Sequence, residues 1–140
     1  ECEGRARQKE QTLLFSPASV PALLWVDGDK IKRAVRHLLL NAFNFTPAGG
    51  VIDVSVDRVE DEVVIRVRDT GQGIDETHLP YIFEPFYKAD PALQTDFGGV
   101  GLGLTVVRLI AAEHKGRINA ESVPGKGSVF TLRLPIQTQI

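Results

Sequence analysis

Two glycine clusters are the residues of this chain best suited to bind a ligand. One follows an aspartate, in Asp69-Thr70-Gly71-Gln72-Gly73-Ile74, and the other is Gly99-Val100-Gly101-Leu102-Gly103-Leu104. Because glycine has no side chain, its backbone N–H groups can approach a ligand closely, and a helix that begins there adds the positive end of its dipole. The two clusters therefore predict a binding site for a polyphosphate.

Neither cluster fits the two phosphate-binding loops that are easiest to recognise. A P-loop requires lysine and then serine or threonine directly after its last glycine, whereas Gly103 is followed by Leu104 and Thr105. A dinucleotide fingerprint requires G-x-G-x-x-G, and neither pair of glycines here has the third at the required distance. The alternative is a flexible loop without a ligand, and the presence of two clusters, one preceded by Asp69, argues against it.

A polar stripe lies on a helix expected upstream of both clusters. His37, Asn41 and Asn44 are spaced i, i+4, i+7, so at about 100° per residue they share one narrow face. The amide oxygen of asparagine suits Mg²⁺, which takes few protein ligands besides substrate phosphates. We expect a buried functional role for Asn41, which Leu40 and Ala42 flank, whereas for Asn44 alone a solvated helix face or a helix end is the simpler interpretation.

Asp69 is expected where a strand ends, and its burial would be costly unless its oxygens were satisfied. An ionised carboxylate only accepts hydrogen bonds, so it can hold the exocyclic amine of adenine and would repel the carbonyl of guanine. The alternative is an ordinary Asx turn, because Asp-x-Gly sequences are common in turns. Taken singly Asp69 favours the turn, and taken with the other motifs it favours a nucleotide.

The composition indicates one globular domain. A chain of 140 residues with 43% apolar and 24% charged residues is long enough for a core and ordinary for a soluble protein. A net charge of −2 gives no sign of a polyanion-binding surface, so nucleic acid is not an expected partner. The single cysteine, Cys2, excludes an internal disulfide and fits a reducing compartment. No apolar run approaches the ~20 residues of a membrane span, and we expect a cytoplasmic domain.

The chain has no methionine, from which we expect a piece of a longer protein. Glu1–Glu10 would then be a linker or the end of a preceding helical domain, with the catalytic domain over residues 11–140.

The apolar periodicity predicts an α/β (α+β) two-layer sandwich, in which about three helices cover one face of a mixed, mostly antiparallel sheet of about five strands. Expected helices run from Asp27 or Asp29 to about Phe45, over Glu76–Phe83 and over Gly101–His114. Expected strands are Gln11–Ser16, Leu23–Val26, Val51–Val59, Glu62–Arg68, Gly116–Ser122 and Gly127–Leu134.

Five segments resemble, in order and spacing, the motifs of the catalytic ATP-binding domain of bacterial sensor histidine kinases, within the GHKL superfamily. They are Asn41–Pro47 (N box), Asp69–Ile74 (G1 box), Phe83–Lys88 (F box), Gly99–Leu104 (G2 box) and Gly125–Phe130 (final glycine motif). The resemblance extends from about Gln11 to Pro135, and five ordered motifs together are highly specific.

The resemblance implies a role for each matching residue. Asn41 would be the catalytic residue and the Mg²⁺ ligand, and Asp69 would read adenine while Gly71 and Gly73 give the base room. Ser128 would help to hold Asp69 through water. The remaining implied ATP contacts are Asn44, Ile74, Lys88, Gly99, Val100, Gly101, Leu102, Gly103 and Leu104, with a lid at about residues 85–98.

The chain departs from the family pattern at three positions. His37 replaces a common asparagine, Asn44 replaces a lysine or arginine that faces phosphate, and Phe45 replaces a frequent tyrosine. Lys88 is the cation that could replace the missing charge. Related ATPases carry a glutamate general base at the position of His37, so its absence disfavours a hydrolase.

The resemblance implies that the chain binds Mg-ATP and donates the γ-phosphoryl group to a histidine on a separate dimerisation and phosphoacceptor domain of a two-component sensor kinase. A response regulator would be an indirect partner, the parent would be a homodimer, often anchored in the inner membrane, and this piece would be monomeric. None of His37, His78 and His114 is followed by an acidic residue, so the chain is not expected to phosphorylate itself. The alternatives are a stand-alone protein-serine kinase of the anti-sigma-factor type and a nucleotide-binding pseudokinase.

Overall fold

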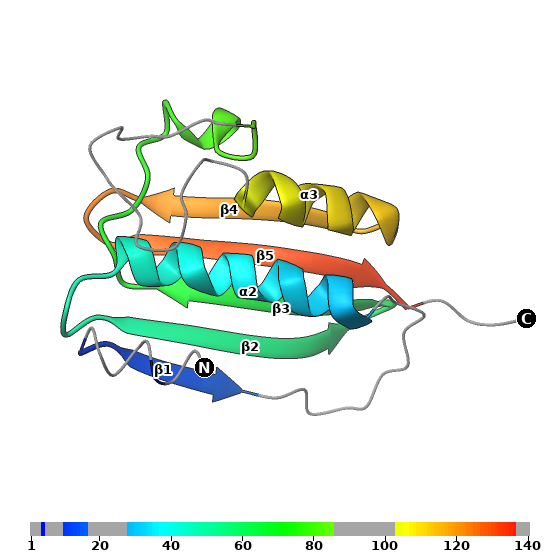
Figure 1. The fold of residues 1–140 in the computed structure, drawn as a ribbon, viewed down its shortest axis with the longest axis horizontal. Helices are drawn as coiled ribbons and strands as arrows, with labels where there is room; N and C mark the ends of the chain where they lie inside the picture. Colours follow the sequence, from blue (N-terminus) through cyan, green and yellow to red (C-terminus); the bar gives the residue numbers. More distant parts are fainter. Residues whose placement is uncertain (1–3, 5–9, 17–27, 86–102, 137–140) are drawn as a thin grey trace, which may run out of the picture.

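The structure, a computed structural model, describes residues 4, 10–16, 28–85 and 103–136. Its centre is a five-stranded sheet with the strand order β1-β2-β3-β5-β4 (Figure 1). The strands are β1 (Thr12–Ser16), β2 (Val51–Val59), β3 (Glu62–Asp69), β4 (Arg117–Val123) and β5 (Gly127–Pro135). β1 pairs in parallel with β2, and the other three pairings are antiparallel, so the sheet is mixed as predicted.

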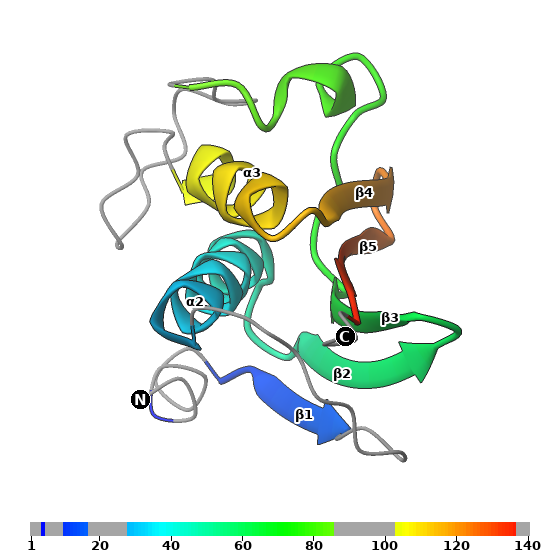
Figure 2. The ribbon, with the colours of Figure 1, turned by 90° about the vertical axis from the view of Figure 1, so that its right-hand side faces the viewer.

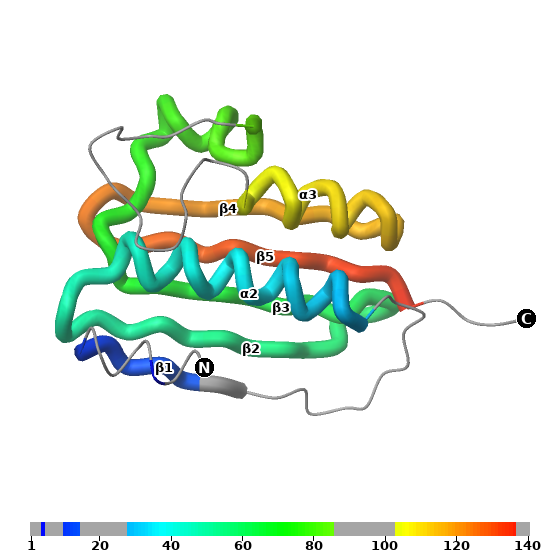
Figure 3. Tube along the Cα trace, viewed as in Figure 1, coloured from blue at the N-terminus to red at the C-terminus, as the bar shows by residue number. Residues whose placement is uncertain are grey.

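Two α-helices, α2 (Gly28–Phe45) and α3 (Gly103–Glu113), lie on the same side of the sheet (Figure 2). α2 buries Ala34, Leu38 and Ala42, which are spaced by four residues and form one apolar stripe. Proline at position 47 cannot continue the helix, and Thr46 and Pro47 follow its last residue. The tube trace in Figure 3 shows that α2 runs along the sheet and ends near the beginning of β2.

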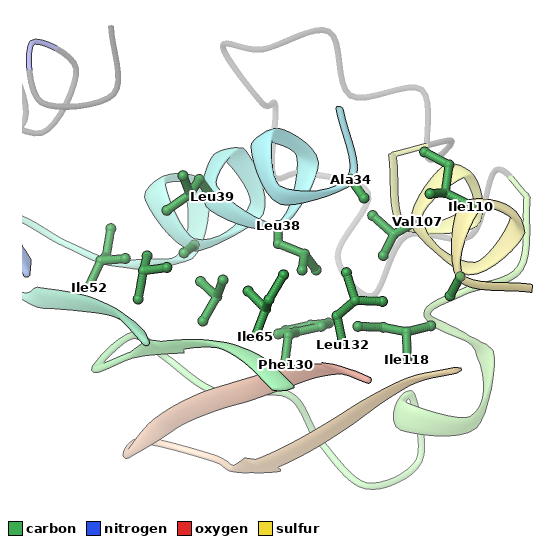
Figure 4. Close-up of a cluster of buried hydrophobic side chains, with 14 of the residues drawn as sticks. Ala34, Leu38, Leu39, Ile52, Ile65, Val107, Ile110, Ile118, Phe130 and Leu132 are labelled. Carbon is green, nitrogen blue, oxygen red and sulfur yellow. The ribbon is translucent and has the colours of Figure 1, made fainter. Parts of the chain in front are cut away.

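The core fills the space between the helices and the sheet (Figure 4). Leu38 from α2 and Val107 from α3 meet Phe130 and Leu132 from β5, and none of these side chains has more than 1% of its surface exposed. Residues that alternate with the core positions lie on the opposite face of the sheet, where β2 and β3 pair Asp53 with Arg68. This alternation is the pattern from which the sequence predicts half-buried strands.

The fold class and most element boundaries are confirmed, but the expected helix over Glu76–Phe83 is wrong. The structure has only a short 3₁₀-helix there, η1 (Leu79–Tyr81), so this segment does not add an α-helix to α2 and α3 in the described part of the chain. Pro80 lacks the N–H that an α-helix would need at this point. Asp75 Oδ1 accepts from both the N–H and the hydroxyl of Thr77 at 2.9 Å, which stabilises the first turn of this segment.

Some expected elements fall outside the described residues, namely the strand at Leu23–Val26, the segment Glu1–Glu10 apart from its residues 4 and 10, and nearly all of the lid. Among the described helices, none combines the length and apolar character that a bilayer crossing requires.

Candidate functional site

Asp69 is the last residue of β3, and only 3% of its surface is exposed. Its Oδ1 accepts a hydrogen bond of 2.9 Å from the backbone N–H of Gly71, so the Asx turn considered as the alternative is present. Burial raises the pKa of the Asp69 carboxyl, and backbone N–H groups of Gly71 and Ser128 partly offset the rise because they stabilise the charged form. A carboxylate has about four acceptor sites, so these bonds leave capacity for a donor on a ligand.

Ser128 lies directly across from Asp69 on β5, and both side chains are buried on the helix-covered side of the sheet. The Ser128 hydroxyl is 2.8 Å from the hydroxyl of Ser122 on β4. Ser122 Oγ also accepts from the N–H of Ile74 at 2.7 Å and donates to the carbonyl of Gly127 at 2.9 Å. One hydroxyl therefore joins the loop after β3 to the turn between β4 and β5.

Three glycines near Asp69 lie where the backbone passes too close for a side chain. A Cβ at Gly71 would overlap the carbonyl oxygen of Phe45, and a Cβ at Gly127 would overlap the carbonyl oxygen of Asp69. Gly73 and Gly127 also have φ angles of +76° and +117°, which favour glycine. These glycines let α2, β3 and the last hairpin approach one another, whatever they contribute toward a ligand.

The stripe on α2 connects the two ends of the candidate site. His37, Asn41 and Phe45 lie on one face of the helix, about 6 Å apart at each step. A Cβ at Gly103, the first residue of α3, would lie 3.2 Å from His37 Nδ1. The carbonyl of Phe45 accepts from the N–H of Gln72 at 3.2 Å. Asn41, which is half-buried, therefore lies between the start of α3 and the loop after β3.

His37 is half-buried at this junction. Burial lowers the pKa of its imidazole, and the positive charges of Arg33 and Arg36 lower it further. The neutral form is therefore favoured. Asn44, at the C-terminal end of the stripe, is also half-buried.

A cleft of about 450 Å³ opens at the end of α2 beside the loop after β3. Its lining residues are Asn44, Phe45, Thr46, Pro47, Thr70, Gly71, Gln72 and Gly125. The volume lies in the range that is typical of small-molecule sites. Of the predicted contact residues, Asn44 and Gly71 line this cleft, whereas Asp69, Ser128 and Asn41 do not.

α3 begins at Gly103, and the N–H groups of its first turn have no acceptor within the helix. The side of the helix near this end is tied to the segment that precedes residue 86. The hydroxyl of Thr105 donates to the carbonyl of Phe83 at 2.8 Å, and Arg108 pairs with Glu84 at 3.4 Å. These contacts hold both ends of the segment between residues 85 and 103 close together.

Five of the remaining predicted contacts lie outside the described residues, namely Lys88, Gly99, Val100, Gly101 and Leu102. Leu104 is half-buried and packs against the core. Across the described ranges there is no group of three or more His, Cys, Asp or Glu side chains that could hold a metal by themselves. A cation held here would need oxygen atoms of the ligand in addition to Asn41, which is the manner in which Mg²⁺ is usually bound with phosphates.

Ser122 and Thr105 are not identified by the sequence analysis. The signal for Ser122 is the alternation along β4, in which Ile118, Ala120 and Ser122 face inward, because a hydroxyl at an inward position must find hydrogen-bond partners. Thr105 gives a comparable signal, since it is polar on the buried face of α3.

The chain matches the family described as histidine kinase-, DNA gyrase B-, and HSP90-like ATPase over residues 26–138. Sensor histidine kinase RppB of Synechocystis is 39% identical over 112 residues, which are 80% of this chain and 25% of that protein. Sensor protein SrrB of Staphylococcus aureus is 38% identical over 109 residues, which are 78% of this chain and 19% of that protein. The chain thus spans a quarter or less of the length of these relatives.

Solved structures with the same fold come from histidine kinases. The catalytic domain of ThkA matches with a TM-score of 0.81 and 28% identity, covering 97% of this chain and 87% of that one. Full-length ShkA, solved in complex with AMPPNP, matches with a TM-score of 0.82 and 26% identity over 97% of this chain and 28% of that one. The mycobacterial kinase MprB, with a TM-score of 0.81 and 23% identity over 98% of this chain and 91% of that one, shows the fold alone.

Proposed function

Because the chain belongs to the family of histidine kinase-, DNA gyrase B- and HSP90-like ATPases, we propose that it binds Mg-ATP and donates the γ-phosphoryl group to a histidine. The acceptor lies on a separate helical dimerisation and phosphoacceptor domain of a sensor kinase, which in turn serves a response regulator. Relatives named as sensor histidine kinases favour this activity over that of the other ATPases in the family. Phosphoryl transfer from ATP places the domain in the cytoplasm, and the parent is a homodimer.

The buried carboxylate of Asp69 is the observation that carries the proposal. It is 3% exposed, its pKa is raised by burial, and it lies across from a second buried acceptor, Ser128. The backbone bonds from Gly71 and Ser128 leave acceptor sites of this carboxylate unused, and the exocyclic amine of adenine would fill one of them. Gly71, Gly73 and Ile74 would border the base, because they continue the same segment.

The phosphate end of the proposed site lies toward the start of α3. The N–H groups of its first turn, which have no acceptor within the described helix, and the dipole of the helix favour an anion near Gly103 and Leu104. Gly99–Leu102 and Lys88 would complete this end. Asn41 lies between the two ends on α2, and its amide oxygen suits Mg²⁺, which when bound would neutralise charge on the phosphates. Asn44 would lie nearby on the same stripe.

In phosphoryl transfer the protein positions the reactants and takes no covalent part in the step. The bond from the γ-phosphorus to the β–γ bridging oxygen breaks, the lone pair of an acceptor imidazole nitrogen forms the new bond to phosphorus, and ADP leaves. The residues of this chain hold the base, place the phosphates and stabilise their charge. The acceptor comes from another domain, so the chain alone does not phosphorylate itself.

Calorimetric titration with a non-hydrolysable ATP analogue, with and without Mg²⁺, tests the binding step. We expect Mg²⁺-dependent binding of the adenine nucleotide and much weaker binding of the guanine analogue. Asn41→Ala should remove most of the Mg²⁺ dependence while the protein keeps its circular dichroism spectrum. A folded protein that binds no adenine nucleotide would refute the proposal and indicate a domain kept for structure or partner contact.

Transfer of labelled phosphate to a supplied helical-hairpin domain tests the second step. The acceptor is offered in two forms, one with histidine and one with serine at the accepting position. Label on the histidine form alone supports the proposed kinase. Label on the serine form would instead identify a protein-serine kinase, and binding without transfer to either form would identify a pseudokinase.

A further inference from the structure

The hydroxyl of Ser122 has all of its hydrogen-bonding capacity engaged. A serine hydroxyl offers one proton and two acceptor sites. Ser122 Oγ has three neighbours, which are the N–H of Ile74 at 2.7 Å, the carbonyl of Gly127 at 2.9 Å and the hydroxyl of Ser128 at 2.8 Å. The number of partners equals the number of bonds that the group can make.

The chemistry of these partners determines the position of each proton. The carbonyl of Gly127 can only accept, so the single proton of Ser122 points to it. The N–H of Ile74 can only donate, so it takes one acceptor site of Ser122. The Ser128 hydroxyl must then be the donor in the bond between the two serines. Its proton is turned away from any ligand, and only its lone pairs remain.

Ser128 and Asp69 therefore form a pair of acceptors. They are direct partners in the register of β3 and β5, and both are buried, with 6% and 3% of their surfaces exposed. Side chains directly opposite each other on adjacent strands lie about 4.5–5.5 Å apart at Cβ, which is close enough for one ligand group or one water to reach both. The carboxylate has no proton to give when it is ionised, and the hydroxyl has none available.

We propose that Ser122 is a positioning residue that sets the nucleobase preference, because it holds the proton of Ser128 and leaves the Ser128–Asp69 pair able only to accept. This inference rests on the proposed binding of ATP. The exocyclic amine of adenine is a donor and fits the pair, whereas the carbonyl at the same place in hypoxanthine or guanine does not. A water that bridges the two side chains gives the same preference. It donates one proton to Ser128 and the other to Asp69, so it can only accept from the base.

Removal of the Ser122 hydroxyl frees the proton of Ser128. In Ser122→Ala the Ser128 hydroxyl can rotate and donate, either to a base carbonyl or to the bridging water, which then has a proton for that carbonyl. The loss of the bond to Ile74 also loosens the loop after β3, but this affects both nucleotides equally. The ratio of the dissociation constants of ITP and ATP is therefore the informative quantity, because a uniform loss of affinity cancels in it.

The experiment is a calorimetric titration of ATP and ITP with Mg²⁺ into four proteins, which are the wild type, Ser122→Ala, Ser128→Ala and the double variant. We expect Ser122→Ala to lower the ITP-to-ATP ratio about three- to tenfold, the effect of one hydrogen bond. In the Ser128→Ala background the same change should leave the ratio unaltered, because the rotating hydroxyl is gone. Ser55→Ala, on the opposite face of β2, is the matched control and should keep the wild-type ratio.

The outcomes separate this inference from the proposed function. A wild type that binds neither nucleotide refutes the proposed function. A wild type that prefers ATP, with a ratio that Ser122→Ala leaves unchanged, overturns the inference alone. An equal fall of the ratio in the presence and absence of the Ser128 hydroxyl also overturns it, because the effect would then not pass through Ser128.

Discussion

The charged form of Asp69 suits the proposed contact with adenine but is unfavourable for folding, because the carboxylate is buried. Its raised pKa means that the folded state holds the proton more tightly than the unfolded chain. Asp69 therefore favours folding at a pH below its unfolded pKa, and this contribution is lost as the pH rises through the higher folded value. At neutral pH the ionised carboxylate weakens the fold and at the same time offers the acceptor that the proposed contact with adenine would use.

Asp69→Asn should raise the stability of the fold and weaken the binding of ATP. The amide still accepts from the N–H of Gly71 but carries no charge, so we expect a higher Tm at pH 7 and a smaller difference near pH 4. ATP affinity should fall about 10- to 100-fold, as for a lost hydrogen bond to a charged group. Thermal unfolding at both pH values and calorimetric titration measure the two effects. An unchanged nucleotide affinity would contradict the role proposed for Asp69.

His37 behaves in the opposite sense, because burial and two arginines lower its pKa. A lowered folded pKa gives stability above the unfolded value, 6.5, and this is lost as the pH falls through the folded value. The free energy of unfolding should fall between pH 7 and pH 5, and His37→Asn should make this fall smaller. Urea unfolding at the two pH values measures it. His78→Asn, away from α2, is the control for the change of residue type. An equal response in both variants would show that His37 is not the titrating group.

The residues that carry motifs were easier to predict than the residues that support them. Asp69 and Gly71 stand out because their types and spacing are unusual, and the structure joins them by a 2.9 Å hydrogen bond. Ser122 is one serine among several, and only its inward position on β4 and its three neighbours distinguish it. A sequence shows which groups are present, but which side of a strand they face near a turn depends on the register.

At the scale of elements, the end of α2 is held by Gln11, the residue directly before β1. Gln11 is 7% exposed, and its Nε2 donates to the carbonyl of Phe43 at 3.0 Å and to that of Thr46. These two bonds tie the residue before β1 to the last turn of α2 and to Thr46. The same helix carries Asn41, and Gln11 thus supports the site without reaching it.

Gln11→Ala should destabilise the domain by about 1–3 kcal/mol, because two buried hydrogen bonds to the end of α2 are lost. Thr12→Ala is the matched control, since its side chain is exposed, and should change the unfolding free energy by less than about 0.5 kcal/mol. Chemical denaturation of the two variants against wild type gives both values. Equal effects of the two substitutions would show that the amide of Gln11 does not secure the helix end.

Long elements with a clear period were predicted well, and the short one was not. α2 repeats apolar residues over most of its 18 residues, and β2 alternates apolar and polar residues from Ile52 to Asp57, so each gives several consistent signals. The segment Glu76–Phe83 has too few residues for a period to be decisive, and it contains Pro80, which lacks the N–H that a longer α-helix would use.

At the scale of the molecule, one core joins both helices to the sheet, so stability and site geometry share the same contacts. Leu38 is fully buried at the centre of this core, whereas 57% of Leu109 on α3 is exposed. Leu38→Ala should lower the free energy of unfolding by about 2–5 kcal/mol. Leu109→Ala should stay within about 0.5 kcal/mol. Urea unfolding compares this pair of identical substitutions, and similar losses would mean that the core is not organised around α2.

The strand order has a consequence for synthesis of the chain on the ribosome. Of the five described strands, β5 is the last to be made, yet it lies inside the sheet between β3 and β4. Until Gly127–Pro135 has left the exit tunnel, β3 has an open edge, β4 has no neighbour, and Asp69 has no Ser128 across from it. The nascent domain cannot complete its sheet from the N-terminus onward, and the proposed nucleotide site is among the last features to form. A translation pause upstream of residue 127 would thus hold a binding domain that does not yet bind.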